Sequence, residues 1–148
     1  MRKLGILLLT FFLLTGCGKE EPFYLNEEYY GTSNITEIAA SELQELEEQQ
    51  ASFVVFVYQP MCTTSSNFET VLNEFINEEQ LSIYKISFSN SDNTSIREKI
   101  RFYPSAVIYH DGKVVDALDA GSDEDTPYFE SVDGFKEWLT KYVLLKEE

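Results

Sequence analysis

Cys62 stands where an apolar run of strand length gives way to a segment with helical spacing. The run begins at Phe53 and ends at Tyr58, and Pro60 separates it from the cysteine. The free N–H groups at a helix N-terminus carry partial positive charge and favour a thiolate over a thiol. The position therefore predicts a nucleophilic cysteine that attacks disulfide bonds. The alternative is an inert, buried small residue, since free cysteine is among the most buried residue types.

Ser65 follows three residues later, where a second cysteine would complete a redox pair. In a dithiol protein the second thiolate releases a mixed disulfide from within the same molecule. A serine hydroxyl cannot perform that displacement, so Cys62 would depend on an outside thiol. The sequence leaves two interpretations of Ser65 open: it hydrogen-bonds the thiolate, or it is a polar residue of the first helical turn. Thr63 and Thr64 are expected to face solvent without a role.

The first 16 residues have the pattern of a signal peptide. Arg2 and Lys3 precede an apolar stretch too short to span a bilayer comfortably. The stretch ends in Leu-Thr-Gly-Cys17, which resembles the lipobox of bacterial lipoproteins, where the cysteine is lipidated and becomes the mature N-terminus. The alternative is an ordinary signal peptide or an uncleaved anchor that happens to contain a cysteine. We therefore expect a signal peptide at 1–16, a lipidated Cys17 with a polar tether over 17–30, and a folded domain over 31–148.

This assignment predicts where the protein resides and how its cysteines are used. Lipidation would place the protein on the outer face of the bacterial cytoplasmic membrane, an extracytoplasmic compartment that permits disulfides. Of the two cysteines, Cys17 would be consumed by the lipid. Cys62 would then be the only free thiol, so a disulfide dimer through Cys62 is a further hypothesis, and an intramolecular disulfide is excluded.

The charge of the chain limits its partners. It carries 26 acidic and 11 basic residues, for a formal net charge of −15. Such a balance argues against a nucleic-acid partner, because a protein that binds nucleic acid needs basic patches on its surface. Acidic residues cluster between Asp116 and Asp125, but their spacing does not follow a calcium-binding EF-hand. We therefore expect a solvated acidic loop, no metal site and no cofactor, and no catalytic or metal-binding role for the single histidine, His110.

Apolar periodicity predicts the elements that would position Cys62. Helical spacing predicts helices and short apolar runs predict strands. Alternation of strands and helices followed by a hairpin predicts an α/β fold with a mixed central sheet and helices on both faces, in the order β-α-β-α-β-α-β-β-α. The strands are expected at 35–38, 52–58, 81–88, 105–109 and 114–118, and the helices at 41–50, from about 62 to 76, at 94–101 and from about 133 to 143.

Three local patterns refine this outline. Ser41, with Gln44 three residues on, is typical of a capping box that starts the first helix. The dipeptide Asp111-Gly112 is a strong hairpin signal between the last two strands. The acidic stretch from Asp119 to about Glu130 is expected to be a loop.

This order of elements resembles the thioredoxin fold over about Ile35 to Leu145. The segment from Met61 to Ser65 resembles the Trp-Cys-x-x-Cys active-site loop of that family, with only the first cysteine kept. Tyr103-Pro104-Ser105 resembles its cis-proline segment, which faces the active cysteine and pairs with an extended client backbone. The resemblance implies that Cys62 and Ser65 occupy the catalytic positions. It also implies client-binding positions at Met61, Tyr103, Pro104 and Ser105.

Three departures from the family pattern bear on function. Ser65 replaces the resolving cysteine, and Met61 replaces the aromatic residue before the first cysteine. Phe56, six residues before Cys62, stands where thioredoxins carry a buried carboxylate that assists proton transfer. We therefore expect monothiol disulfide exchange or trapping of protein or peptide clients through Cys62. The alternative is a redox-inactive binding or accessory module in secretion or peptide export.

Overall fold

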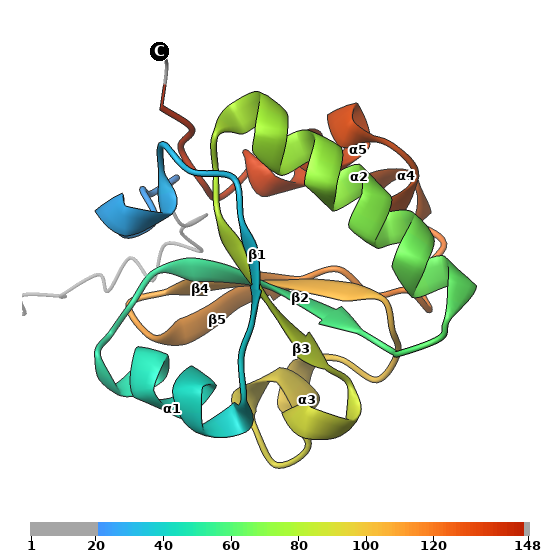
Figure 1. Cartoon of the computed structure of the whole chain (residues 1–148), viewed down its shortest axis with the longest axis horizontal. Helices are drawn as coiled ribbons and strands as arrows, with labels where there is room; N and C mark the ends of the chain where they lie inside the picture. The colour runs from blue at the N-terminus through green and yellow to red at the C-terminus, as the bar shows by residue number, and fades with distance from the viewer. Residues whose placement is uncertain (1–20, 147–148) are drawn as a thin grey trace, which may run out of the picture.

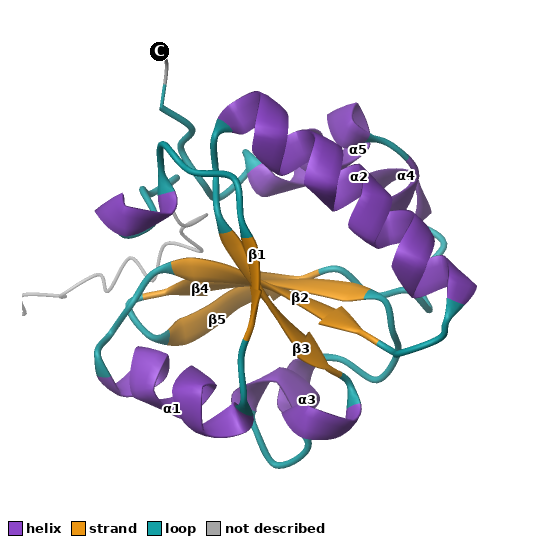
Figure 2. Cartoon of the chain, in the orientation of Figure 1, coloured by secondary structure: helices purple, strands orange, loops and turns teal. Residues whose placement is uncertain are grey.

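The structure is a computed structural model that describes residues 21–146. It contains one five-stranded mixed sheet in the order β1-β3-β2-β4-β5, with helices on both faces, as the sequence predicts (Figures 1 and 2). The strands are β1 (Ile35–Glu37), β2 (Phe53–Tyr58), β3 (Ile83–Ser87), β4 (Ser105–His110) and β5 (Lys113–Ala117). The helices are α1 (Ala40–Glu48), α2 (Thr63–Glu79), α3 (Ser95–Lys99), α4 (Thr126–Glu130) and α5 (Val132–Leu139), with short 3₁₀ turns η1 (Glu27–Tyr29) and η2 (Ser89–Ser91).

Strand β2 is the centre of the sheet and leads directly to Cys62. Its Val55 pairs with Tyr84 of the parallel strand β3 and with Val107 of the antiparallel strand β4. Residues 53–57 are all buried, as expected for β-branched and aromatic residues of a strand covered on both faces. The strand therefore fixes the position at which the chain turns into α2.

Helices α2, α4 and α5 cover one face of the sheet, and α1 and α3 cover the other (Figure 2). Phe68 lies on the buried side of α2, and its ring meets the rings of Phe56 on β2 and Phe135 on α5 edge to face. Such aromatic contacts add to the free energy gained by burying apolar area. They hold α2, and with it the N-terminus of the helix beside Cys62, against the sheet.

The first helix begins two residues earlier than the sequence indicates. Its N-cap is Ala39, and the side chain of Glu42 accepts the backbone N–H of Ala39 at 2.8 Å. Ser41 therefore lies inside the first turn, and the prediction that Ser41 caps the helix is wrong. The hydrogen bond from the Ala39 N–H to the Glu42 side chain is one of the two hydrogen bonds of a capping box.

The expected acidic loop contains a short helix, α4, at its end. Pro127 lies in the first turn of α4, where a fixed φ favours helix and no N–H is needed. Gly134 of α5 allows the two helices to approach, because a Cβ there would lie 2.2 Å from the carbonyl oxygen of Pro127. Helix α5 ends at Leu139, so Tyr142 and Val143, predicted within it, lie in the following turn and in a β-bridge, respectively.

The chain is packed on the domain from Phe23 onward, within the segment expected to be a polar tether. Phe23, Leu25 and Tyr29 are buried. Phe23 forms a bridge with Val143 and stacks on His110 with ring centroids 3.8 Å apart. The folded unit thus begins earlier than residue 31. The predicted signal peptide and Cys17 lie outside the described residues, and none of the helices within 21–146 is long and apolar enough to cross a membrane.

Candidate active site at the start of α2

Cys62 is the N-cap residue of α2, at the place where the sequence puts it. Its backbone is extended, with φ −96° and ψ 121°, and its N–H donates to the carbonyl of Gln59 at 3.2 Å. Met61 precedes it with a positive φ of 61° and a fully exposed side chain. The turn therefore presents a partly exposed sulfur at the N-terminus of a 17-residue helix.

Thr64 is the principal hydrogen-bond partner of the sulfur. Its hydroxyl lies 3.0 Å from Sγ of Cys62. This hydroxyl first, then the backbone N–H and hydroxyl of Ser65 and the backbone N–H of Thr64, lower the pKa of the Cys62 thiol to about 7. Donors aimed at a sulfur stabilise the thiolate more than the thiol. Near neutral pH about half of the thiol is then ionised.

The sequence assigned no role to Thr64. The signal that was available is its place at the second position of a helix with cysteine at the N-cap. At that position a short hydroxyl side chain can reach back to the capping atom. The expectation that Thr64 is solvent-facing is correct as to exposure, but the residue contacts the sulfur.

Ser65 is buried, with 2 % of its surface exposed, and its hydroxyl accepts the backbone N–H of Gln59 at 3.1 Å. The two interpretations left open by the sequence are both partly realised. Ser65 belongs to the first turn of α2 and holds the preceding loop, and it also stabilises the thiolate of Cys62 through its N–H and hydroxyl.

Tyr103 and Pro104 are joined by a cis peptide bond, as the resemblance to the cis-proline segment implies. Pro104 is buried, whereas Tyr103 is 39 % exposed and packs edge to face on Phe88. Ser105 is fully buried at the start of β4, and its hydroxyl donates to the carbonyl of Leu118. The Ser105 side chain is therefore engaged within the fold, and Tyr103 supplies the exposed side chain of the segment.

A cavity of about 550 Å³ brings this segment together with the start of α2. Thr64 on one side and Tyr103 with Pro104 on the other are among its lining residues. Cys62 does not itself line the cavity; the link to the thiol is Thr64, which lines the cavity and also contacts the Cys62 sulfur.

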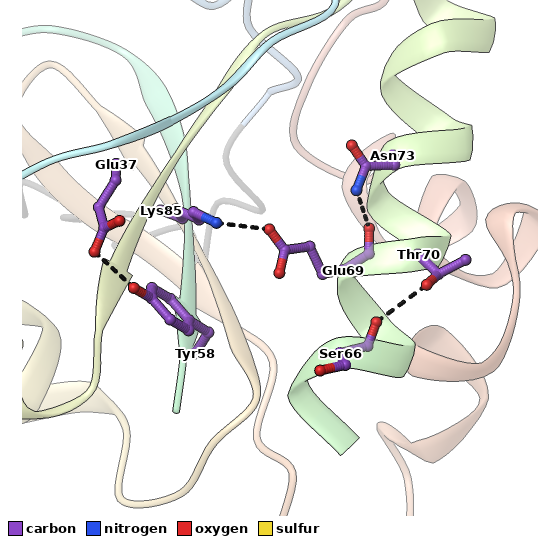
Figure 3. Close-up of polar contacts among 7 residues, drawn as sticks. All are labelled: Glu37, Tyr58, Ser66, Glu69, Thr70, Asn73 and Lys85. Carbon is purple, nitrogen blue, oxygen red and sulfur yellow. Dashed lines mark hydrogen bonds and ion pairs between the residues drawn. The ribbon is translucent and has the colours of Figure 1, made fainter. Parts of the chain in front are cut away.

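On the other side of α2, charged side chains connect the helix to the sheet. Figure 3 shows Lys85 of β3 reaching Glu69 of α2, 2.8 Å away, and the hydroxyl of Tyr58 donating to Glu37 of β1 at 2.6 Å. The hydrogen bond to Glu37 is the main reason that the pKa of Tyr58 is raised to about 12. Tyr58, the last residue of β2 before the loop that carries Cys62, thus directs its hydroxyl to β1.

Phe56, at the position of the family's buried carboxylate, is fully buried. It pairs in register with Lys85 on β3, and the acidic partner of Lys85 is Glu69 on α2. The arrangement therefore provides no carboxylate at residue 56 to accept a proton from a thiol on α2.

The histidine and the acidic residues that the sequence analysis considered lie away from Cys62. His110 is at the end of β4 beside the N-terminal end of β2, far from Cys62, and its Nδ1 lies 3.0 Å from the hydroxyl of Ser52. Asp116 accepts the indole N–H of Trp138, and Asp125 accepts the backbone N–H of Asp119. Within residues 21–146, no group of three or more histidine, cysteine or acidic residues is placed to hold a metal ion.

Comparison with known structures identifies the fold. The chain is similar to a mutant thioredoxin from Halobacterium salinarum NRC-1, with 17% identity, a TM-score of 0.58, and coverage of 79% of this chain and 97% of that one. It is similar to the oxidised thioredoxin of Plasmodium falciparum, with 16% identity, a TM-score of 0.55, and coverage of 73% and 97%. The thioredoxin of Fasciola hepatica gives 18% identity, a TM-score of 0.55, and coverage of 73% and 99%.

Comparison by sequence identifies the family. A search of the curated proteins found no match to this chain. The family model described as thioredoxin matches residues 34–127, which is more than half of the chain and includes Cys62 and Pro104. This chain belongs to the thioredoxin family.

Proposed function

We propose that the protein carries out monothiol disulfide exchange on protein or peptide clients through Cys62. The observation that carries the proposal is the environment of the sulfur. Cys62 is partly exposed at a helix N-terminus, with the Thr64 hydroxyl 3.0 Å away and a thiol pKa of about 7. A nucleophilic thiol is most effective when its pKa is near the ambient pH.

The reaction begins when the Cys62 thiolate attacks one sulfur of a client disulfide. A bond forms between Cys62 and that sulfur, the client disulfide breaks, and the second client sulfur leaves as a thiolate. Another thiolate, from a third client cysteine or a small-molecule thiol, then attacks the client sulfur of the mixed disulfide. Cys62 leaves as a thiolate, and a new disulfide forms between the client and the attacking thiol.

This cycle is an exchange in which Cys62 ends as it began. A third cysteine of the same client yields a rearranged disulfide, so isomerisation needs no external oxidant or reductant. With a small thiol, the client is left with one free thiol and one mixed disulfide. Ser65 in place of a second cysteine is compatible with both outcomes, because neither requires a resolving thiol on α2.

The test is capture of the mixed disulfide by mass spectrometry. Full-length protein in mild detergent is mixed with a peptide that carries one internal disulfide, and the reaction is stopped with acid. We expect an adduct on Cys62 that disappears when a small thiol is added. The Cys62→Ser protein is the control. Adduct formation no faster than that of the denatured protein would contradict the proposal.

A second candidate function is a binding module without redox turnover. It is favoured by Ser65, which occupies the position of the second cysteine and whose hydroxyl accepts the backbone N–H of Gln59. In this case the Cys62→Ser protein would keep full function in its host. A disulfide dimer through Cys62 is a third hypothesis, and non-reducing electrophoresis of the purified protein distinguishes it from the other two.

We further propose that Cys17 is lipidated and anchors the protein on the outer face of the bacterial cytoplasmic membrane. The support is the sequence of residues 1–17, in which two basic residues are followed by an apolar stretch and then by Leu-Thr-Gly-Cys. In cells fed a labelled fatty acid, the protein should take up label and sediment with membranes. Cys17→Ser should abolish the labelling and Cys62→Ser should not. Labelling that survives Cys17→Ser would refute the anchor.

A further inference from the structure

The cavity at the start of α2 has an apolar interior. Phe68, Val71 and Phe129 are among the lining residues, and the rings of Phe68 and Phe129 meet edge to face with centroids 4.8 Å apart. Tyr103 and Pro104 add a further apolar side. The cavity can therefore hold the hydrocarbon part of a side chain.

Only one of the ten lining residues carries a formal charge, and it is Glu130, the last residue of α4. Glu130 is exposed and makes no ion pair with any residue of the described range 21–146. The other lining residues are Thr64, Asn67, Phe68, Val71, Tyr103, Pro104, Ala120, Thr126 and Phe129.

The segment that leads from β5 to the cavity adds negative charge and no positive charge. Residues 119–130 contain five acidic and no basic side chains. Asp119 and Asp125 accept backbone N–H groups of the loop, which leaves Asp123 and Glu124 exposed to solvent.

Two lysines that follow α4 in the chain are engaged with other side chains. Lys136 of α5 is paired with Glu79 of α2. Lys141 donates to the hydroxyl of Tyr128 at 2.7 Å. The carboxylate of Glu130 thus has no cationic partner supplied by these two lysines.

We propose that this cavity receives a lysine or arginine side chain of the client polypeptide, close in sequence to the cysteine that Cys62 attacks. The proposal rests on the proposed disulfide exchange and specifies its clients. The methylene stem of a long basic side chain packs on apolar surface while its charged end stays accessible. In this cavity the stem lies on Phe68 and Phe129, and the cationic end reaches Glu130. The net charge of −15 favours approach of a basic segment.

Three matched peptides test the proposal. Each carries the same internal disulfide and differs at one position next to a cysteine, which is lysine, norleucine or glutamate. The measurement is the rate of mixed-disulfide formation with the full-length protein. We expect the lysine peptide to react about threefold faster than the norleucine peptide, as for one exposed ion pair, and the glutamate peptide to be slowest. The preference should shrink at high salt.

Variants connect the preference to the cavity. Glu130→Gln should abolish the advantage of lysine over norleucine. Glu137→Gln, which removes an exposed carboxylate of α5 outside the cavity lining, should leave it unchanged. Equal rates for lysine and norleucine, or a preference that survives Glu130→Gln, would overturn the proposal.

A binding measurement separates this inference from the proposed exchange. The Cys62→Ser protein cannot form a mixed disulfide, but its affinity for the three peptides can be measured by calorimetry. A lysine preference that depends on Glu130 supports the inference even where no exchange occurs. An absence of that preference rejects the inference, whether or not Cys62 reacts.

Discussion

The buried hydroxyl of Ser65 accepts the backbone N–H of Gln59 across the turn that carries Cys62, at a distance of 3.1 Å. In the Cys-x-x-Cys motif of the family, the second cysteine stands at the position of Ser65. An oxygen is a stronger hydrogen-bond acceptor than a thiol sulfur. Ser65, which stands in place of the resolving cysteine, therefore also holds the loop that presents the Cys62 thiol.

Ser65→Ala should destabilise the fold. It leaves the N–H of Gln59 without its acceptor, and the loss of such a partner costs about 1–3 kcal/mol. We expect the free energy of unfolding, measured in urea, to fall by about 1–2 kcal/mol. The matched control is Ser66→Ala, one residue on and exposed, which should change it by less than about 0.5 kcal/mol. An equal loss in both variants would contradict the role of Ser65.

Thr64→Val should raise the pKa of the Cys62 thiol. The change keeps the shape of the side chain and removes the hydroxyl that contributes most to lowering the pKa to about 7. We expect the midpoint of the alkylation rate against pH to rise by about one pH unit, which corresponds to the loss of one hydrogen bond to a charged atom. Thr63→Val should leave the midpoint in place. A midpoint unaffected by Thr64→Val would show that the hydroxyl does not act on the sulfur.

The stability of the protein should depend on pH through Cys62. The thiol pKa is lowered from 9.0 to about 7 on folding, so the folded state binds fewer protons than the unfolded state between these values. The resulting stabilisation is fully present above pH 9.0 and is lost as the pH falls through about 7. The free energy of unfolding of the wild type, relative to Cys62→Ser, should therefore rise from about pH 6 to about pH 9.5. A difference that is constant over this range would refute the lowered pKa.

Ser65→Cys should create a redox pair. It restores the Cys-x-x-Cys spacing, so the second thiolate could resolve a mixed disulfide on Cys62. We expect catalysed reduction of a peptide disulfide with a dithiol as the reductant, at a low rate because Phe56 provides no base for the second thiol. Ser66→Cys adds an exposed thiol at the wrong spacing and should not support turnover. If neither variant is active, the site differs from that of a dithiol reductase in more than the missing cysteine.

The sequence predicts those parts of the fold that depend on strong local patterns. The apolar run of β2 and the spacing of Phe68 and Phe75 on α2 each fit a single kind of element. Asp111-Gly112 forms the predicted hairpin, with positive φ at both residues. Gly112 also allows close contact with α1, because a Cβ there would lie 2.2 Å from the carbonyl oxygen of Glu47.

The parts that the sequence mispredicts depend on tertiary contacts. Ser41 is a better isolated N-cap than Ala39, but Glu42 satisfies the Ala39 N–H in the folded chain. Phe23 belongs to a polar segment by composition and is buried only because Val143 and His110 lie beside it.

The candidate site shows the same division. Cys62 and Pro104 are identified from local sequence and a family resemblance. Thr64 acquires its role from the geometry of a single helical turn. Glu130 becomes part of a cavity because α4 packs near α2, and nothing in the acidic stretch itself predicts that placement.

The burial of Phe23 has a consequence for the direction in which the thiol faces. Phe23 is fixed beside His110, and the register of β2 with β4 puts this contact at the opposite end of β2 from Cys62. Six residues of strand span roughly 20 Å. With the chain anchored through Cys17 as proposed, the domain would be held by its base, and Cys62 would point outward from the bilayer. Such a thiol would meet clients that arrive from the extracytoplasmic space rather than segments still embedded in the membrane.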